Sequence, residues 1–186
     1  MKHFTALLAL ALSVLIPAQA RTVADVTLQE SITVQGDTLS LYGAGIRTKY
    51  FMKLYVGSLY GAETGLDAKG VLASEQTTAV RLNIISGMIT SDRMIDTIEE
   101  GFDTATGGNV APLRERLDNF LAVFDEAVEV GDQFTMVSIP GSGLEAYKNG
   151  ELLTLVEGDD FRQALFAIWL GEKPADKKLK RAMLGQ

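Results

Sequence analysis

Residues 41–60 read LYGAGIRTKYFMKLYVGSLY, and they carry the plainest structural signal in the chain. Within them, residues 50–60 are rich in aromatic and other β-favouring side chains, which predicts one long β-strand. Gly43 and Gly45 precede Arg47, and glycine allows another group to approach the backbone closely. The stretch therefore predicts a β-sheet that presents an arginine beside a segment of small residues.

Alternation of apolar and polar residues predicts further strands on both sides of this stretch. In residues 79–86, Val80, Leu82 and Ile84 share one face, while Arg81, Asn83 and Ile85 lie on the other. Asn149-Gly150 is a strong signal for a hairpin turn. The other predicted strands are residues 31–42, a hairpin around Gly36-Asp37, and residues 133–139, 144–148 and 151–156.

Apolar residues at helical spacing predict helices between and after the strands. These run from a Thr90-Ser91-Asp92 cap to about Phe102, from Pro112 to about Phe124, from Gly158 to Gly171, and from Pro174 to about Leu184. We assign Trp169 to the buried face of the third of these helices, which runs from Gly158 to Gly171. Because no internal repeat or low-complexity linker interrupts this order, we predict one α+β domain, an open antiparallel sheet backed by a layer of helices.

The first twenty residues have the layout of a secretory signal peptide. Lys2 and His3 precede an apolar run from Phe4 to Ile16, and the triplet Ala18-Gln19-Ala20 follows. The run is shorter than the about 20 apolar residues that a membrane span needs. We therefore expect cleavage after Ala20, a location in the periplasm or outside the cell, and a mature domain of residues 21–186 without a transmembrane span.

Composition removes several classes of chemistry. The 186 residues include no cysteine and one histidine, His3, which lies in the predicted signal peptide. A mature chain without either residue cannot use Ser-His-Asp or Cys-His catalysis, nor metals held by those side chains. A formal charge of −7 argues against a nucleic-acid partner. Gly43-Ala44-Gly45 lacks the third glycine of a dinucleotide-binding motif, because position 48 is threonine. From the missing metal-binding residues and this incomplete motif, we expect neither a metal nor a cofactor.

Three strings in the chain are familiar as a set: residues 41–47 (LYGAGIR), 51–56 (FMKLYV) and 161–171 (FRQALFAIWLG). In this order, with Gly131-Asp132 and Ile139-Pro140-Gly141 between them, they resemble the chalcone isomerase family. The resemblance covers nearly all of residues 21–186 and is stronger to exported bacterial chalcone isomerase-like proteins than to the plant enzymes. It implies a long-stranded antiparallel sheet, a layer of helices, and a ligand cleft between the two.

One of the five functional positions of the plant enzymes is kept in this chain. Their substrate-binding arginine corresponds to Arg47, but the strand threonine corresponds to Tyr55 and the last threonine to Arg162. The functional tyrosine of the plant enzymes corresponds to a position near residues 91–93, and their functional asparagine to one near Glu100. This chain has neither residue type there. The resemblance therefore implies the fold without the full catalytic set.

An arginine together with a strand tyrosine resembles the fatty-acid-binding members of the same superfamily, in which these two groups hold a carboxylate. A guanidinium offers a planar pair of donors to the carboxylate oxygens, and a phenol adds a third donor. We therefore predict an exported, non-catalytic protein that binds a small amphipathic or carboxylate ligand, similar to a fatty acid, through Arg47 and Tyr55. Arg162, Arg81 and Asn83 are further candidates for the ligand site.

Two other functions remain open from the sequence. One is an intramolecular lyase of the chalcone isomerase type, in which Arg47 stabilises the enolate and Tyr55 is a second catalytic candidate. The other is a periplasmic module that binds a protein partner and no small ligand. Whether the chain is an enzyme is therefore left open, and the sequence does not identify a protein partner.

Overall fold

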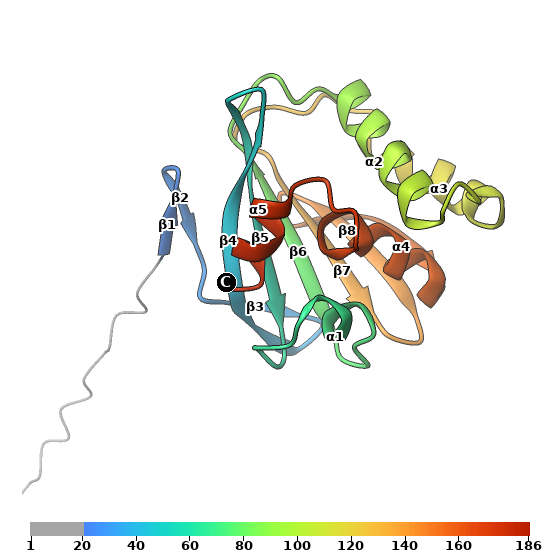
Figure 1. The fold of residues 1–186 in the computed structure, drawn as a ribbon, viewed down its shortest axis with the longest axis horizontal. Coiled ribbons are helices and arrows are strands. Elements are labelled where there is room, and N and C mark those ends of the chain that lie inside the picture. Colours follow the sequence, from blue (N-terminus) through green and yellow to red (C-terminus); the bar gives the residue numbers. More distant parts are fainter. Residues whose placement is uncertain (1–20) are drawn as a thin grey trace, which may run out of the picture.

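The computed structural model describes residues 21–186, so the predicted signal peptide lies outside the described residues. Within them, one antiparallel sheet of seven strands runs in sequence order from β3 to β9 (Figure 1). The strands are β3 (Ser31–Val34), β4 (Asp37–Lys49), β5 (Met52–Gly61), β6 (Thr78–Ile84), β7 (Gln133–Ile139), β8 (Gly143–Lys148) and β9 (Glu151–Glu157). With its layer of helices, this sheet confirms the predicted α+β class and antiparallel architecture.

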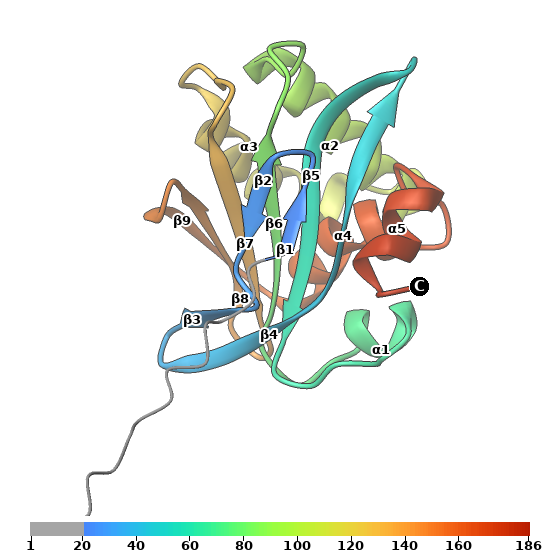
Figure 2. The same cartoon turned by 90° about the vertical axis from the view of Figure 1, so that its left-hand side faces the viewer.

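Helices cover one face of the sheet, and a small hairpin covers part of the other. In Figure 2 the hairpin of β1 (Arg21–Val23) and β2 (Val26–Leu28) lies in front of the sheet, and the helices lie behind it. The helices are α1 (Ala68–Leu72), α2 (Ser91–Ala105), α3 (Arg114–Leu121), α4 (Asp159–Leu170) and α5 (Lys177–Met183), with 3-10 turns η1 (Ala111–Leu113) and η2 (Ala122–Phe124) flanking α3. Among residues 21–186, no helix has the length and apolar character of a membrane span.

The main core lies between the sheet and the helical layer. Phe161 at the start of α4 is fully buried, and its ring centroid lies 5.0 Å from that of Phe102 on α2 and 5.7 Å from that of Phe120 on α3. Tilted and edge-on aromatic pairs at such distances are favourable beyond the area that they bury. These three rings therefore hold α2, α3 and α4 together as one layer.

Helix α5 lies directly on the glycine-rich part of β4 and β5. A Cβ atom at Gly43 would lie 2.2 Å from the carbonyl oxygen of Ala182, and one at Gly45 would lie 2.6 Å from Ala182 Cβ. At Gly57, the register partner of Gly45, a Cβ would lie 3.2 Å from Leu179 Cδ1. The close approach expected at Gly43 and Gly45 is therefore made by a helix of the chain itself.

Several details differ from the sequence prediction. The turn between β4 and β5 is Tyr50-Phe51, so β5 begins at Met52 rather than at residue 50. No Gly, Asn or Asp marks this turn, although both residues have positive φ, 50° and 65°. The last helix begins at Lys177 because Asp176, and not Pro174, caps it. The sequence does not predict α1 or the β1–β2 hairpin, since elements of three to five residues carry too short a pattern.

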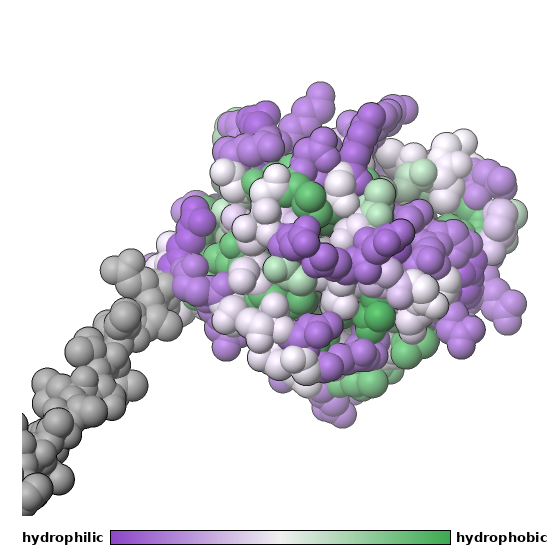
Figure 3. Space-filling model, turned by 90° about the horizontal axis from the view of Figure 1, so that it is seen from below, coloured by the Kyte–Doolittle hydropathy of each residue, from purple (hydrophilic) through white to green (hydrophobic). Residues whose placement is uncertain are grey.

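Exposed apolar side chains are confined to a few places on the surface. At the end of the molecule near α1, hydrophilic side chains predominate and apolar ones form small separate patches (Figure 3). Elsewhere in residues 21–186, the large exposed apolar residues fall into two groups, one at the β4–β5 turn end of the sheet and one on the edge strand β9. They are Tyr50, Phe51, Met52, Met88 and Val130 in the first group, and Leu152, Leu153 and Leu155 in the second.

The sheet face away from the helices carries a buried polar network. Glu145 is buried and accepts hydrogen bonds from Tyr147 Oη at 2.6 Å and from Gln35 Nε2 at 2.5 Å. Burial, together with the hydrogen bond to Glu145 and its negative charge, raises the pKa of the Tyr147 hydroxyl to about 12. Tyr147 therefore keeps its proton in the folded protein at pH values where an exposed tyrosine loses it.

This raised pKa predicts a loss of stability in strong base. Because the folded state binds the Tyr147 proton more tightly, the contribution to stability is complete below the unfolded pKa of 10.0 and is lost as pH rises through about 12. We expect the urea midpoint of the wild type to fall more steeply over this pH window than that of Tyr147→Phe. Circular dichroism in urea measures both slopes, and equal slopes would contradict the prediction.

Candidate functional site

A cavity of about 550 Å³ lies at the end of the sheet nearest the β4–β5 turn. Residues of β4, β5 and β6 form one side, and α2, α4 and the loop from α4 to α5 form the others. The apolar and aromatic lining includes Leu54, Tyr55, Leu82, Ile89, Met94, Ile98, Ile168, Trp169, Pro174 and Ala175. Ligand cavities for small organic molecules measure about 300 to 1,000 Å³, so the space suits such a ligand.

Arg47 lines this cavity from the end of β4. Its Nη1 lies 3.3 Å from Oδ2 of Asp176, and both side chains are largely buried. Asp176 also caps α5, because its Oδ1 accepts hydrogen bonds from the backbone N–H groups of Lys178 and Leu179. Burial acts to raise the pKa of Asp176, but these bonds and Arg47 outweigh it and lower the pKa, so the group is a carboxylate. The remaining N–H groups of Arg47 have no acceptor among residues 21–186.

Tyr55 is the register partner of Arg47 on the neighbouring strand β5. A break in register precedes it, so that Leu54 and Tyr55 both line the cavity although they are neighbours in a strand. The Tyr55 hydroxyl accepts a hydrogen bond from Trp169 Nε1 at 3.0 Å, and its own proton has no acceptor within the described residues. Burial raises the pKa of Tyr55, so at neutral pH the hydroxyl is an uncharged donor.

The charged residues around the cavity are mostly basic. The cationic lining residues are Arg47, Lys49, Arg93, Lys173 and Lys177, and the anionic ones are Glu100 and Glu172. This local excess of positive charge stands in a chain whose formal charge is −7. Because clustered charge at a low-dielectric cavity raises the local concentration of opposite charge, the cavity favours an anionic ligand. Among residues 21–186, no cluster of acidic or histidine side chains suits a metal ion.

Arg162 lies outside this cavity. It is buried on α4, where its Nη1 donates to Ser138 Oγ at 3.0 Å and its Nε donates to Asp159 Oδ1 at 2.5 Å. The guanidinium therefore joins the start of α4 to β7. The structure does not bring this candidate to the same place as Arg47 and Tyr55.

Arg81 and Asn83 lie on the opposite face of the sheet. Arg81 donates to Thr135 Oγ1 at 3.0 Å and to Gln29 Oε1 at 2.9 Å, and Asn83 Oδ1 accepts a hydrogen bond from Gln133 at 2.8 Å. Alternation along β6 points its apolar side chains toward the helices and these two residues away from them. The expectation that they line the cleft is therefore not met.

The sequence did not predict the two residues that contact Arg47 and Tyr55. Asp176 contacts Arg47, and Trp169 contacts Tyr55. The position of Asp176 could have been predicted, since an aspartate just before an apolar helical pattern is a common N-cap. The bond from Trp169 to Tyr55 has no signal, because the residues lie 114 positions apart. Arg93 and Glu100 also line the cavity.

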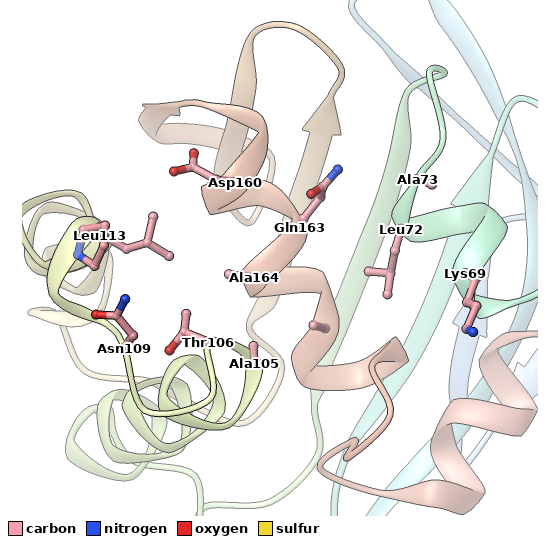
Figure 4. Close-up of a pocket in the computed structure, with 12 residues that line it drawn as sticks. Lys69, Leu72, Ala73, Ala105, Thr106, Asn109, Leu113, Asp160, Gln163 and Ala164 are labelled. Carbon is pink, nitrogen blue, oxygen red and sulfur yellow. The ribbon is translucent and has the colours of Figure 1, made fainter.

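A second hollow, of about 580 Å³, lies between α1, α4 and the segment that joins α2 to α3. It is open to solvent, and Figure 4 shows its two charged lining residues, Lys69 and Asp160, on opposite sides. These two charges are opposite in sign and lie apart, so they do not form one binding point for an anion. The cavity beside Arg47 and Tyr55 is the stronger candidate for a ligand site.

The fold and this cavity define a class of protein, an α+β domain with a basic, partly apolar cavity between an antiparallel sheet and its helices. Residues 20–185 match the family of chalcone isomerase-like proteins. The chain belongs to the chalcone isomerase-like family, as the sequence motifs predict.

A solved structure agrees with this assignment. The chain is similar to the fatty-acid binding protein AtFAP1 of Arabidopsis thaliana, with a TM-score of 0.69 and 18% sequence identity. The match covers 89% of this chain and 96% of that one, so the likeness extends over the whole fold. A search of curated proteins finds no match to this chain.

Proposed function

We propose that this protein binds a small amphipathic carboxylate, similar to a fatty acid, in the cavity beside Arg47 and Tyr55. The observation that carries the proposal is the pairing of two donors on adjacent strands at an apolar cavity. Arg47 keeps N–H groups without an acceptor among residues 21–186, and Tyr55 keeps its proton. Both are donors of the kind that a carboxylate accepts most strongly.

The head group of such a ligand is held by charge and by hydrogen bonds. One carboxylate oxygen accepts from the Arg47 guanidinium, and the Tyr55 hydroxyl supplies a further donor. Asp176 already neutralises part of the Arg47 charge, so Lys49, Arg93 and the other rim cations supply the attraction that draws the anion in. Their long side chains adjust to the head group without disturbing the fold.

The tail of the ligand lies against the apolar lining between β5, β6, α2 and α4. Each methylene removed from water contributes about 0.8 kcal/mol, which corresponds to about fourfold in Kd. AtFAP1, which has the same fold, is a fatty-acid binding protein, and this likeness supports the proposal.

A series of straight-chain saturated fatty acids tests the proposal by isothermal titration calorimetry. We expect one site, with affinity rising about fourfold for each added methylene until the cavity is full. The matching methyl esters are expected to bind more weakly, since they carry no anionic head group. Absence of binding at every chain length would overturn the proposal.

A chalcone assay separates binding from catalysis at the same site. If the wild type removed the chalcone absorbance band and Arg47→Ala did not, the protein would be an intramolecular lyase in place of a binding protein. The binding proposal predicts that the band is unchanged when the protein is added.

We also propose that the protein is exported and that residues 1–20 are removed. The charged start, apolar run and Ala18-Gln19-Ala20 triplet support this, and the family match begins at residue 20, beside the predicted cleavage point. N-terminal sequencing of protein from the periplasmic and extracellular fractions should find Arg21 as the first residue.

A further inference from the structure

The turn between β4 and β5 combines two features that folding alone does not favour. Tyr50 and Phe51 both have positive φ, 50° and 65°, a conformation that Asn and Gly adopt far more readily than aromatic residues. The two residues are also 82% and 101% exposed, so burial of the rings offsets little of this strain. Strained backbone and unburied aromatic rings at one tip indicate a role outside the fold.

Cationic and apolar residues surround the two rings. Lys49 and Lys53 are exposed on either side of the turn, and Lys49 Nζ lies 5.8 Å from the centroid of the Tyr50 ring. Aromatic rings next to lysine are typical of segments at the boundary of a bilayer, where the ring enters the interface and the ammonium meets lipid phosphate. Met52 on the same hairpin adds exposed apolar surface.

We propose that the β4–β5 turn docks the protein onto an anionic lipid bilayer. Tyr50 and Phe51 enter the interface, while Lys49 and Lys53 contact the head groups. The turn forms the tip of the β4–β5 hairpin at the end of the sheet, and Figure 2 shows this tip standing apart from the helices. This surface goes beyond the proposed ligand site, and Lys49, which also lines the cavity, places the cavity beside the bilayer.

The contact is confined to one side of this end of the molecule. The loop between η2 and β7 also exposes an apolar residue, Val130, but it carries the exposed acids Glu126 and Glu129. An anionic surface repels this loop and attracts the lysines of the turn. Val130 is therefore a matched control for an exposed apolar residue that does not contact the bilayer.

Flotation with phosphatidylcholine vesicles, prepared with and without phosphatidylglycerol, tests the proposal. We expect the wild type to bind the anionic vesicles, to bind neutral vesicles more weakly, and to be released by added salt. The double variant Tyr50→Asn/Phe51→Gly should lose about tenfold or more of this binding, because both rings are removed. Since Asn-Gly is the preferred pair for such a turn, the variant is expected to keep or raise its Tm.

Two controls separate this proposal from the proposed ligand binding. Val130→Ser should bind anionic vesicles as the wild type does. The turn variant should bind dissolved fatty acid as the wild type does, so loss of vesicle binding alone identifies the turn as a membrane contact. Failure of the wild type to bind anionic vesicles, or equal binding by the turn variant, would overturn the proposal and leave the ligand site untouched.

Discussion

Gly43→Ala is expected to lower the free energy of unfolding by about 3 kcal/mol, which corresponds to a fall in Tm of roughly 6 to 12 °C. A Cβ at this position would lie 2.2 Å from the Ala182 carbonyl oxygen and 2.8 Å from the backbone nitrogen of Gly185. Both obstacles are backbone atoms, so no side-chain rotation relieves the clash and α5 must move away from the sheet. Thermal unfolding followed by circular dichroism measures the loss.

Gly45 offers a rescue that Gly43 does not. Its added Cβ would meet the Cβ of Ala182 at 2.6 Å, so Ala182→Gly removes the obstacle and should restore much of the stability lost in Gly45→Ala. The same second change should not rescue Gly43→Ala. Gly87→Ala is the control for a glycine with no neighbour within 4 Å, and it should unfold close to the wild type. Rescue of both variants, or of neither, would show that α5 does not lie as described.

Arg47→Ala is expected to weaken binding of a fatty acid about ten- to hundredfold. A hydrogen bond to a charged group contributes about 1.5 to 3 kcal/mol, which converts to a change of that size in Kd. The affinity of Arg47→Lys should lie between those of the wild type and Arg47→Ala, since lysine keeps the charge and loses the planar pair of donors. Calorimetric titration of each variant with one saturated fatty acid measures these differences.

A matched control is Lys69→Ala, which removes a cation from the second hollow and should leave the affinity unchanged. The methyl ester of the same fatty acid should bind the wild type and Arg47→Ala about equally, because its head group offers no negative charge to the guanidinium. If Arg47→Ala bound the free acid as tightly as the wild type, Arg47 would have no role in holding the ligand.

Much of the fold was predictable because its signals are local. Asn149-Gly150 marks the β8–β9 turn, and the structure has positive φ at both residues, 54° and 89°. The Tyr50-Phe51 turn has the same backbone signs without the usual residues, so the sequence placed both in a strand. Prediction from local sequence therefore failed at this turn, where two exposed aromatic residues occupy positions that Asn and Gly usually fill.

The site was predictable only in part, because its geometry depends on distant contacts. Arg47 and Tyr55 were predicted from the family resemblance, and the structure makes them register partners that line one cavity. Arg81 and Asn83 could have been set aside by alternation alone, since the apolar face of β6 had to meet the helices. Arg162 and Asp159 have the i,i+3 spacing of a helical ion pair, but the bond from Arg162 to Ser138 on β7 spans 24 positions, and no sequence spacing indicates it.

Quenching of Trp169 by a brominated fatty acid tests the central claim most directly. Trp169 is the single tryptophan of the chain; it lines the cavity and donates to Tyr55, so its emission reports on this site alone. A ligand held beside Arg47 and Tyr55 brings bromine close to the indole, and we predict quenching that saturates at one ligand per protein. Binding of the brominated acid with the Trp169 emission unchanged, or no binding at all, would contradict the account.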